Sequence, residues 1–346
     1  MRKLLIGILF LSVIAVPVQA TAFTAPPAPD SAVVMVPEQP ETFSEGLAAV
    51  LREAVDFFYP AFRSAAVTCF GVIAAVLLAS LTQNIPGAKT GVIDMVTTIA
   101  VALLLLSPSG ALIRLGSDTV KEISEYGRLL LPVMTAAMAA EGATATSAAL
   151  YAGTAFFDAA LSGIISSVIV PMLYIFLCLS VAGCATGEEI LGKLIGLVKW
   201  AMTWILKIVL YVFTGYMSIT GVVSGTADAA AIKATKLTIS GMVPVVGGIL
   251  SDASEAVLVS AGLVKSAVGV YGVLVVIALW IRPFIEIGVQ YLLLKVSAGI
   301  CGIFGAKAPV KLLDSFSGAM GMLLAMTGAV SVLMMVSVVC FMRGVA

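Results

Sequence analysis

Apolar runs long enough to cross a lipid bilayer recur along almost the whole of this chain. A membrane helix needs about 20 consecutive, mainly apolar residues, and the runs at 95–113 and 317–341 are of that length. Charged residues make up only 11% of the 346 residues, whereas a soluble domain carries about 25% and uses them to cover its surface. The sequence therefore predicts an all-α polytopic membrane protein.

The apolar runs predict about seven transmembrane helices with segments broken by proline and glycine. A charged segment with Arg114, Lys121 and Arg128 follows the second run and is predicted to form a loop. Pro171 interrupts the fourth run, which therefore holds either one long span or two broken ones. The predicted spans are 65–81, 95–113, 129–140, 151–184, 200–223, 267–281 continuing past Pro283 into 284–304, and 317–341.

The N-terminus has the pattern of a cleavable secretory signal peptide at 1–20. Arg2 and Lys3 form a short positive region, an apolar stretch follows, and small residues precede a predicted cleavage site after Ala20. An uncleaved membrane anchor is the alternative. Residues 21–64 are predicted to form a short extracytoplasmic linker and an amphipathic helix, and residues 65–346 the polytopic transmembrane domain.

Several classes of active site are excluded by what the chain lacks. It has no histidine, the commonest general base and metal ligand, and no GxxxxGK[ST] sequence to hold nucleotide phosphates. Its five cysteines form no CxxC pair and are predicted to be small buried residues. We therefore expect no catalytic, cofactor-binding or metal site, and no enzymatic activity. Basic and acidic residues number 19 each, so no basic surplus indicates nucleic-acid binding.

The segment around Pro244 is the candidate pore or gate. Pro244 lacks an amide hydrogen, and the adjacent Gly247 and Gly248 weaken any helix that runs through them. In hydrocarbon the freed backbone groups need partners, so such a segment belongs in a protein-lined or water-lined cavity. Ser251 and Asp252 follow, and under this interpretation they face a conduit. The alternative is a loop between two helices, with Ser251 or Asp252 capping the second helix.

Isolated ionisable residues inside apolar stretches are the second group of candidates: Glu141, Asp158, Lys207, Glu286 and Lys295. Such residues are costly in lipid and usually face a bundle interior or a water-filled path. On that interpretation Glu141 and Asp158 line a passage and Lys207 is their counter-ion. The alternative places each of them at the membrane interface, where the long side chains reach water.

A possible internal repeat is indicated by four prolines. The spacing between Pro132 and Pro171 equals that between Pro244 and Pro283, and Pro132 and Pro244 are each followed by valine. Either this is a coincidence, or a broken-helix unit is duplicated, as in many transporters.

The segment that begins at Pro244 also carries a family resemblance. Residues 244–253, with Glu255, Val257 and Leu258 and the stretch 263–272, resemble the stage III sporulation protein AE family of endospore-forming Firmicutes. The predicted signal peptide, the length and the run of about seven spans agree with that family.

The resemblance implies a role in spore formation. Family members are made in the mother cell and lie in the membrane that engulfs the forespore. They work with other stage III A-operon proteins, including a secretion-type ATPase (AA) and ring-forming proteins (AG and AH), and with forespore protein Q. The implied function is the polytopic membrane component of a secretion or feeding channel.

Two alternatives to the channel remain open from the sequence. One is a stand-alone secondary transporter for a small solute, driven by ion or proton movement through Glu141, Asp158 or Glu286. The other is a structural scaffold without a conduit of its own.

Overall fold

The computed structural model describes residues 24–37, 42–83, 90–242 and 247–343, and between 220 and 265 it describes the backbone alone. Within these ranges there is no β-strand, and six helices are long and apolar enough to cross a membrane. The prediction of an all-helical membrane protein is confirmed. The predicted signal peptide at 1–20 lies outside the described residues.

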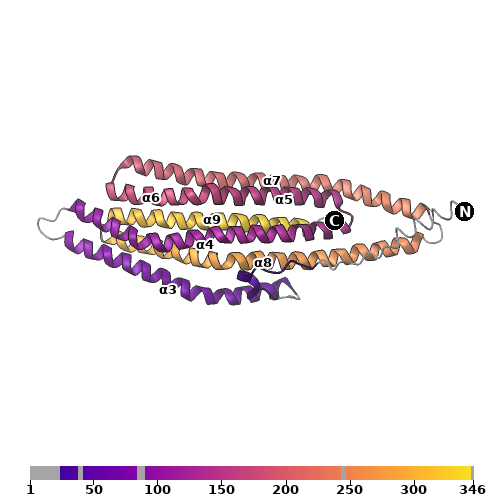
Figure 1. Ribbon diagram of the computed structural model, residues 1–346, viewed down its shortest axis with the longest axis horizontal. Coiled ribbons are helices and arrows are strands. Elements are labelled where there is room, and N and C mark those ends of the chain that lie inside the picture. The colour runs from indigo at the N-terminus through magenta and orange to yellow at the C-terminus, as the bar shows by residue number, and fades with distance from the viewer. Residues whose placement is uncertain (1–23, 38–41, 84–89, 243–246, 344–346) are drawn as a thin grey trace.

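The helices form one elongated bundle (Figure 1). Helix α9 lies in its middle and contacts α4, α5, α6, α7 and α8, whereas α3 packs along one edge against α4 and α8. At one end α7 and α8 extend beyond the other helices. The elements are α2 (Asp30–Val33), α3 (Phe43–Gln83), α4 (Thr90–Ala140), α5 (Thr144–Ile164), the π-helix η1 (Ile165–Ile169), α6 (Val170–Thr186), α7 (Glu189–Met242), α8 (Gly247–Ile303) and α9 (Lys307–Arg343).

Burial falls from the middle of the bundle to its edge. In the most apolar window of α9, 56% of the residues are buried, against 11% in the corresponding window of α7. Helix α9 is therefore the central element on which α4, α5, α6, α7 and α8 pack, and α7 leaves most of its apolar surface uncovered.

The described residues contain fewer spans than predicted because the helices are longer than predicted. The charged segment with Arg114, Lys121 and Arg128 is not a loop, since α4 runs through it from Thr90 to Ala140 and joins two predicted spans. With 51 residues, α4 is about 75 Å long, whereas the hydrocarbon core of a bilayer is about 30 Å thick. Part of the bundle therefore lies outside hydrocarbon, where charged residues are tolerated on a helix.

Most prolines do not break the helices that contain them, in contrast to the prediction. Pro60 lies inside α3, Pro108 and Pro132 inside α4, and Pro283 inside α8. A proline in a helix removes one hydrogen bond, and packed neighbouring helices limit that cost. The two predicted segments on either side of Pro283 are accordingly one continuous helix.

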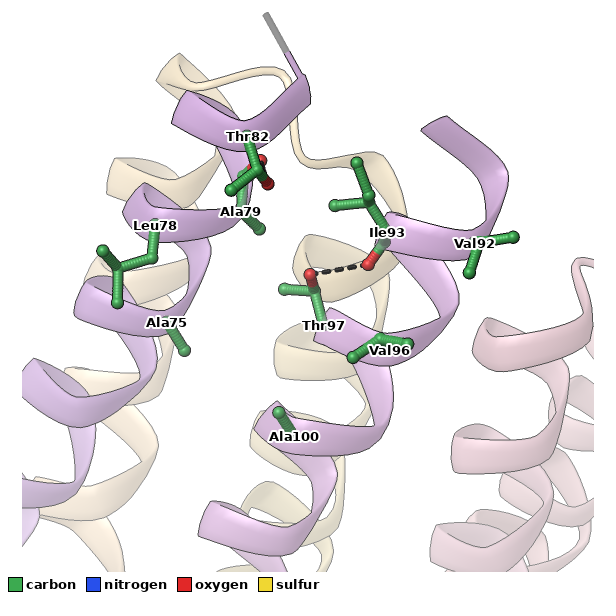
Figure 2. Close-up of a pocket in the computed structure, with 9 residues that line it drawn as sticks. All are labelled: Ala75, Leu78, Ala79, Thr82, Val92, Ile93, Val96, Thr97 and Ala100. Atoms are coloured by element: carbon green, nitrogen blue, oxygen red, sulfur yellow. Dashed lines mark hydrogen bonds between the residues drawn. The ribbon is translucent and has the colours of Figure 1, made fainter. Parts of the chain in front are cut away.

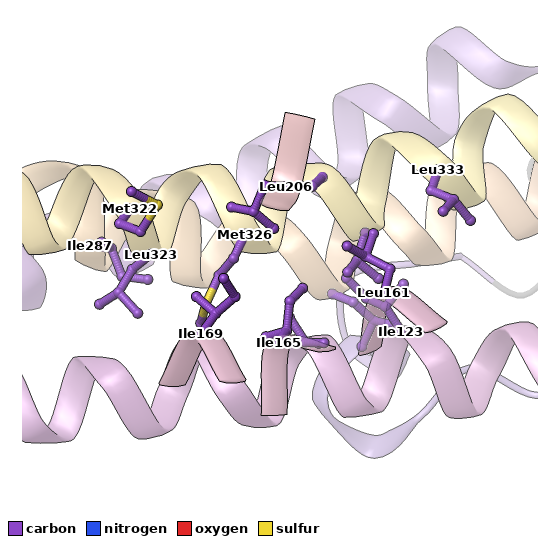
Figure 3. Packing of buried hydrophobic residues seen from close by; sticks show 14 of the residues in the cluster. Ile123, Leu161, Ile165, Ile169, Leu206, Ile287, Met322, Leu323, Met326 and Leu333 are labelled. Carbon is purple, nitrogen blue, oxygen red and sulfur yellow. The ribbon is translucent and has the colours of Figure 1, made fainter. Parts of the chain in front are cut away.

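Pro171 does not interrupt its helix either, but it differs from the other prolines because a π-helical turn precedes it. The Val170 N–H donates to the Ile165 carbonyl, five residues earlier, and the proline that follows cannot donate at all. Ile165 and Ile169 are fully buried, and Figure 3 shows them on the side of their helix that faces α9. The predicted fourth run is therefore one helical rod with a π-helical turn in its middle.

Three reversals of the chain depend on glycine. Gly142 follows α4 with a φ of 94°, Gly187 follows α6 with a φ of 74°, and Gly305 follows α8 with a φ of 75°. Glycine adopts a positive φ without the steric cost that a Cβ brings, so it ends a helix readily. Each reversal returns the next helix, α5, α7 or α9, alongside the one before it.

An open apolar groove of about 450 Å³ lies between the ends of α3 and α4 (Figure 2). Its two hydroxyls are already used, because Thr82 donates to the Ala79 carbonyl and Thr97 donates to the Ile93 carbonyl, each at 2.7 Å. The groove therefore offers few groups that could orient a polar substrate. Its lining residues are Ala75, Leu78, Ala79, Thr82, Val92, Ile93, Val96, Thr97 and Ala100.

Candidate functional site in the bundle core

Asp158, on α5, is the only carboxylate or cationic side chain that is buried among the described residues. Its side chain is 3% exposed. Its Oδ2 accepts a hydrogen bond of 2.6 Å from the Ser124 hydroxyl on α4. A carboxyl group inside an apolar bundle is costly, so its presence there indicates a functional site.

The second oxygen of Asp158 is not satisfied in the same way. Asp158 Oδ1 is buried and has no hydrogen-bond partner among the described residues. Arg128, about one turn beyond Ser124 on α4, interacts electrostatically with this carboxyl group. The exposed Arg128 favours the negatively charged form of this group, whereas burial favours the protonated form, which can donate a hydrogen bond from Oδ1.

A second polar contact lies one turn before Asp158 on α5. The Thr154 hydroxyl donates to the Ser337 hydroxyl of α9 at 3.2 Å, and Ser337 donates onward to the Leu333 carbonyl at 2.8 Å. Thr154 and Ser337 are fully buried. We call Ser124, Arg128, Thr154, Asp158 and Ser337 the Asp158 site. It joins α4, α5 and α9 by polar contacts inside the bundle.

An aromatic cluster packs beside the site, between α5 and α7. Phe157 lies edge-on to Phe213, with ring centroids 5.5 Å apart, and 5.7 Å from the ring of Tyr216. The Tyr216 hydroxyl donates to the Ala149 carbonyl at 2.9 Å. This ring lies directly over Gly153, where any side chain would overlap it. Residue 153 must therefore be glycine for α5 and α7 to pack as closely as they do.

The other predicted ionisable residues are not brought to Asp158. Lys207 is exposed on α7. Glu141 lies in the turn between α4 and α5, about four turns of α5, or roughly 20 Å, from Asp158. Arg128, and not Lys207, is the cation that acts on the Asp158 carboxyl group.

Glu286 and Lys295 form ion pairs on α8. Glu286 accepts from Arg282 at 2.8 Å, four residues earlier on the same helix. Lys295 pairs with Asp314 of α9 at 2.7 Å, and both of these side chains are about half exposed. Exposed pairs of this kind contribute little to stability, about 0–1 kcal/mol each.

The candidate pore segment is only partly covered by the structure. Helix α7 ends at Met242 and α8 begins at Gly247, so Pro244 lies outside the described residues. Gly247, Gly248, Ser251 and Asp252 belong to the first turns of α8, and their side chains also lie outside the described part. Their role in a conduit stays a prediction.

Sequence reasoning missed the partners of Asp158. Ser124 and Arg128 lie four residues apart in the segment that was expected to be a loop, so no helical face was assigned to them. Their spacing places both on one side of a helix. The one available signal was this pairing of a hydroxyl and a cation at helical spacing.

Comparison with known proteins agrees with the sequence resemblance. The family model for stage III sporulation protein AE matches residues 44–344. Stage III sporulation protein AE of Bacillus subtilis (strain 168) is 24% identical over 236 residues, which is 68% of this chain and 59% of that relative. The match thus spans less than two thirds of the relative's length. No solved structure matches the chain.

Proposed function

The chain belongs to the stage III sporulation protein AE family, and on that premise we propose that it is the polytopic membrane component of a secretion or feeding channel. This channel would join the mother cell to the forespore and be required for spore formation. The chain would lie in the mother-cell membrane that engulfs the forespore. Its proposed partners are the secretion-type ATPase AA, the ring proteins AG and AH, and forespore protein Q.

The Asp158 site is the observation that supports a conduit over a scaffold. A scaffold needs only apolar packing between its helices, and a buried carboxyl group would weaken it. In this bundle Asp158 is 3% exposed, holds one hydrogen bond to Ser124 and leaves Oδ1 without a partner among the described residues. Intramembrane carboxyl groups are retained where ions, protons or polar substrates pass.

The same site also favours a second candidate, a secondary transporter that acts alone. Such a transporter would couple solute movement to a proton or ion gradient through Asp158. The two candidates differ in their dependence on partners. A transporter acts without the ATPase, whereas a channel component loses its function when the ATPase is absent.

The experiment that tests the proposed function is deletion and complementation in the sporulating bacterium that carries this gene. We expect deletion to abolish heat-resistant spores and the late expression of forespore genes, and the intact gene to restore both. Co-purification of the ATPase with the tagged chain from membranes would support the channel. A deletion strain that sporulates normally would contradict any role in sporulation.

The Pro244 segment provides a further prediction. Gly248→Leu should place a bulky side chain in the first turn of α8, and Asp252→Ala should remove a carboxylate predicted to face the conduit. We expect each change to reduce heat-resistant spores to the level of the deletion strain, while immunoblots show normal insertion into the membrane. Normal sporulation with both substitutions would exclude this segment as a pore or gate.

A further inference from the structure

Two lysines, one on α7 and one on α9, each reach across to the other helix. Helices α7 and α9 begin at the same end of the bundle (Figure 1). Lys199 Nζ on α7 lies 3.7 Å from the position that a Cβ would take at Gly318 of α9. Lys311 Nζ on α9 lies 3.7 Å from the corresponding position at Gly192 of α7. Each glycine is seven residues from the lysine of its own helix, about 10 Å along the axis.

Helix α6 forms the third side of this junction. Helices α6, α7 and α9 contact one another in pairs. Phe176 of α6 lies 3.9 Å from the Cβ position at Gly318, beside Lys199 Nζ. Lys311 acts electrostatically on the buried thiol of Cys184, also on α6. Both ammonium groups thus lie where three helices meet. We call this place the lysine junction and define it by Lys199, Lys311, Gly192 and Gly318.

The lysine junction carries an excess of positive charge. Among the described residues, no ion pair or hydrogen bond joins either ammonium group to another side chain. The nearest acidic residue on α9, Asp314, pairs with Lys295. On α7 the nearest is Glu189, ten residues before Lys199, or about 15 Å, so it can offset the charge of Lys311 but not that of Lys199. Both lysines are exposed, and an anion from outside the chain can therefore reach them.

The junction lies where two predicted membrane spans begin. The apolar run 200–223 starts directly after Lys199, and the apolar run 317–341 starts six residues after Lys311. A helix that enters a bilayer passes the level of the lipid headgroups just before its apolar run. We therefore expect both lysines to lie at the level of the lipid phosphates.

The surface of α7 beyond the junction suits acyl chains. Trp200 and Trp204 are 59% and 46% exposed, and their ring centroids are 6.2 Å apart. Tryptophan is enriched at the boundary between headgroups and hydrocarbon. Only 11% of the most apolar window of α7 is buried, so an uncovered apolar face adjoins the two lysines.

We propose that the lysine junction binds the phosphate group of an anionic phospholipid whose acyl chains lie along α7. An ammonium group binds phosphate as a point charge, and basic pockets between membrane helices bind anionic lipid headgroups. A free phosphate ion would use the same lysines but leave the apolar face of α7 uncovered, so the lipid is the ligand that fits both features.

The lysine junction is separate from the Asp158 site. Lys311 and Ser337 are both on α9, 26 residues apart, which is about 39 Å along the helix. The inference depends on the two lysines and the exposed face of α7. It holds whether or not the chain forms a channel.

Quenching of tryptophan fluorescence by brominated lipids tests the proposal, because Trp200 and Trp204 adjoin the junction. The full-length chain with Trp280→Phe retains these two as its only tryptophans. It is placed in phosphatidylcholine vesicles with increasing mole fractions of a brominated lipid. We expect half-maximal quenching at a mole fraction of brominated phosphatidylglycerol on the order of 10-fold lower than of brominated phosphatidylcholine. Equal mole fractions for the two lipids would overturn the proposal.

Matched variants locate the binding site. Lys199→Gln/Lys311→Gln should abolish the preference for phosphatidylglycerol, because both positive charges of the junction are gone. The control, Lys193→Gln/Lys307→Gln, removes two exposed lysines from the first turns of the same helices and should keep the preference. Equal losses in the two variants would show attraction to general surface charge and overturn the site.

Inorganic phosphate distinguishes the two sources of a phosphate group. Added at constant ionic strength, it should leave the quenching by brominated phosphatidylglycerol unchanged. A fall in quenching would show that the junction takes free phosphate, against the proposal.

A second measurement needs no variant. A ligand that binds only the folded chain raises its unfolding temperature. The unfolding temperature of the native chain in detergent should therefore rise with added phosphatidylglycerol and not with an equal amount of phosphatidylcholine. The same unfolding temperature with both lipids would also overturn the proposal.

Discussion

A valine in place of Gly153 should prevent the chain from accumulating in the membrane. The added Cβ would overlap the ring of Tyr216. That ring cannot move aside easily, because its hydroxyl bonds to the Ala149 carbonyl and Phe157 packs against it. Overpacking of this kind typically costs about 1–3 kcal/mol, and more when the neighbour is held in place. The measurement is the amount of chain in membrane fractions, with unfolding temperature in detergent.

A matched control lies on the same helix. Gly163 is exposed and has no atom within 4 Å of the position where its Cβ would lie, so Gly163→Val should leave the amount of chain almost unchanged. Gly153→Val combined with Tyr216→Ala should recover part of the loss, because the overlapping ring is gone. Equal losses at Gly153 and Gly163 would show that helix propensity, and not contact with α7, decides the result.

Asp158→Asn should have the largest effect on function. Asparagine keeps the shape of the side chain and can still accept the hydrogen bond from Ser124, so we expect normal amounts of chain in the membrane. It can neither carry the charge that faces Arg128 nor exchange a proton. Heat-resistant spores should therefore fall to the level of the deletion strain.

The control for Asp158→Asn is the same change at an exposed carboxylate. Asp314 pairs with Lys295, and both side chains are about half exposed. Loss of such a pair costs about 0–1 kcal/mol, so Asp314→Asn should sporulate normally. Normal sporulation of Asp158→Asn would show that this carboxyl group serves only in packing.

The all-helical membrane class of this fold was predictable because long apolar runs can be read directly from the sequence. Helix length was not, since Arg114, Lys121 and Arg128 indicate a loop only if every helix ends at the bilayer surface. Helix α4 is about 75 Å long and continues through them over its 51 residues. The prolines were also a poor guide to where helices end. Pro108, Pro132 and Pro283 lie inside continuous helices, because packing against neighbouring helices stabilises a helix that has lost one hydrogen bond.

The site was predictable only in part. Asp158 is recognisable as a lone carboxylate in an apolar stretch, and the structure places it in the bundle core. Its partner Ser124 has no signal of its own, because one serine in a helix is usually bonded to its own backbone. The contact between Ser124 and Asp158 joins α4 to α5, and such a contact depends on the three-dimensional register of two helices.

Transfer of small molecules from mother cell to forespore is the most direct test of the proposed channel. Engulfed cells are given an isotope-labelled amino acid, and label is then measured in purified forespores. We predict that forespores of the Asp158→Asn strain contain as little label as those of the deletion strain, with the chain present at its normal level, while the Asp314→Asn strain matches the wild type. Normal labelling of Asp158→Asn forespores would contradict the account.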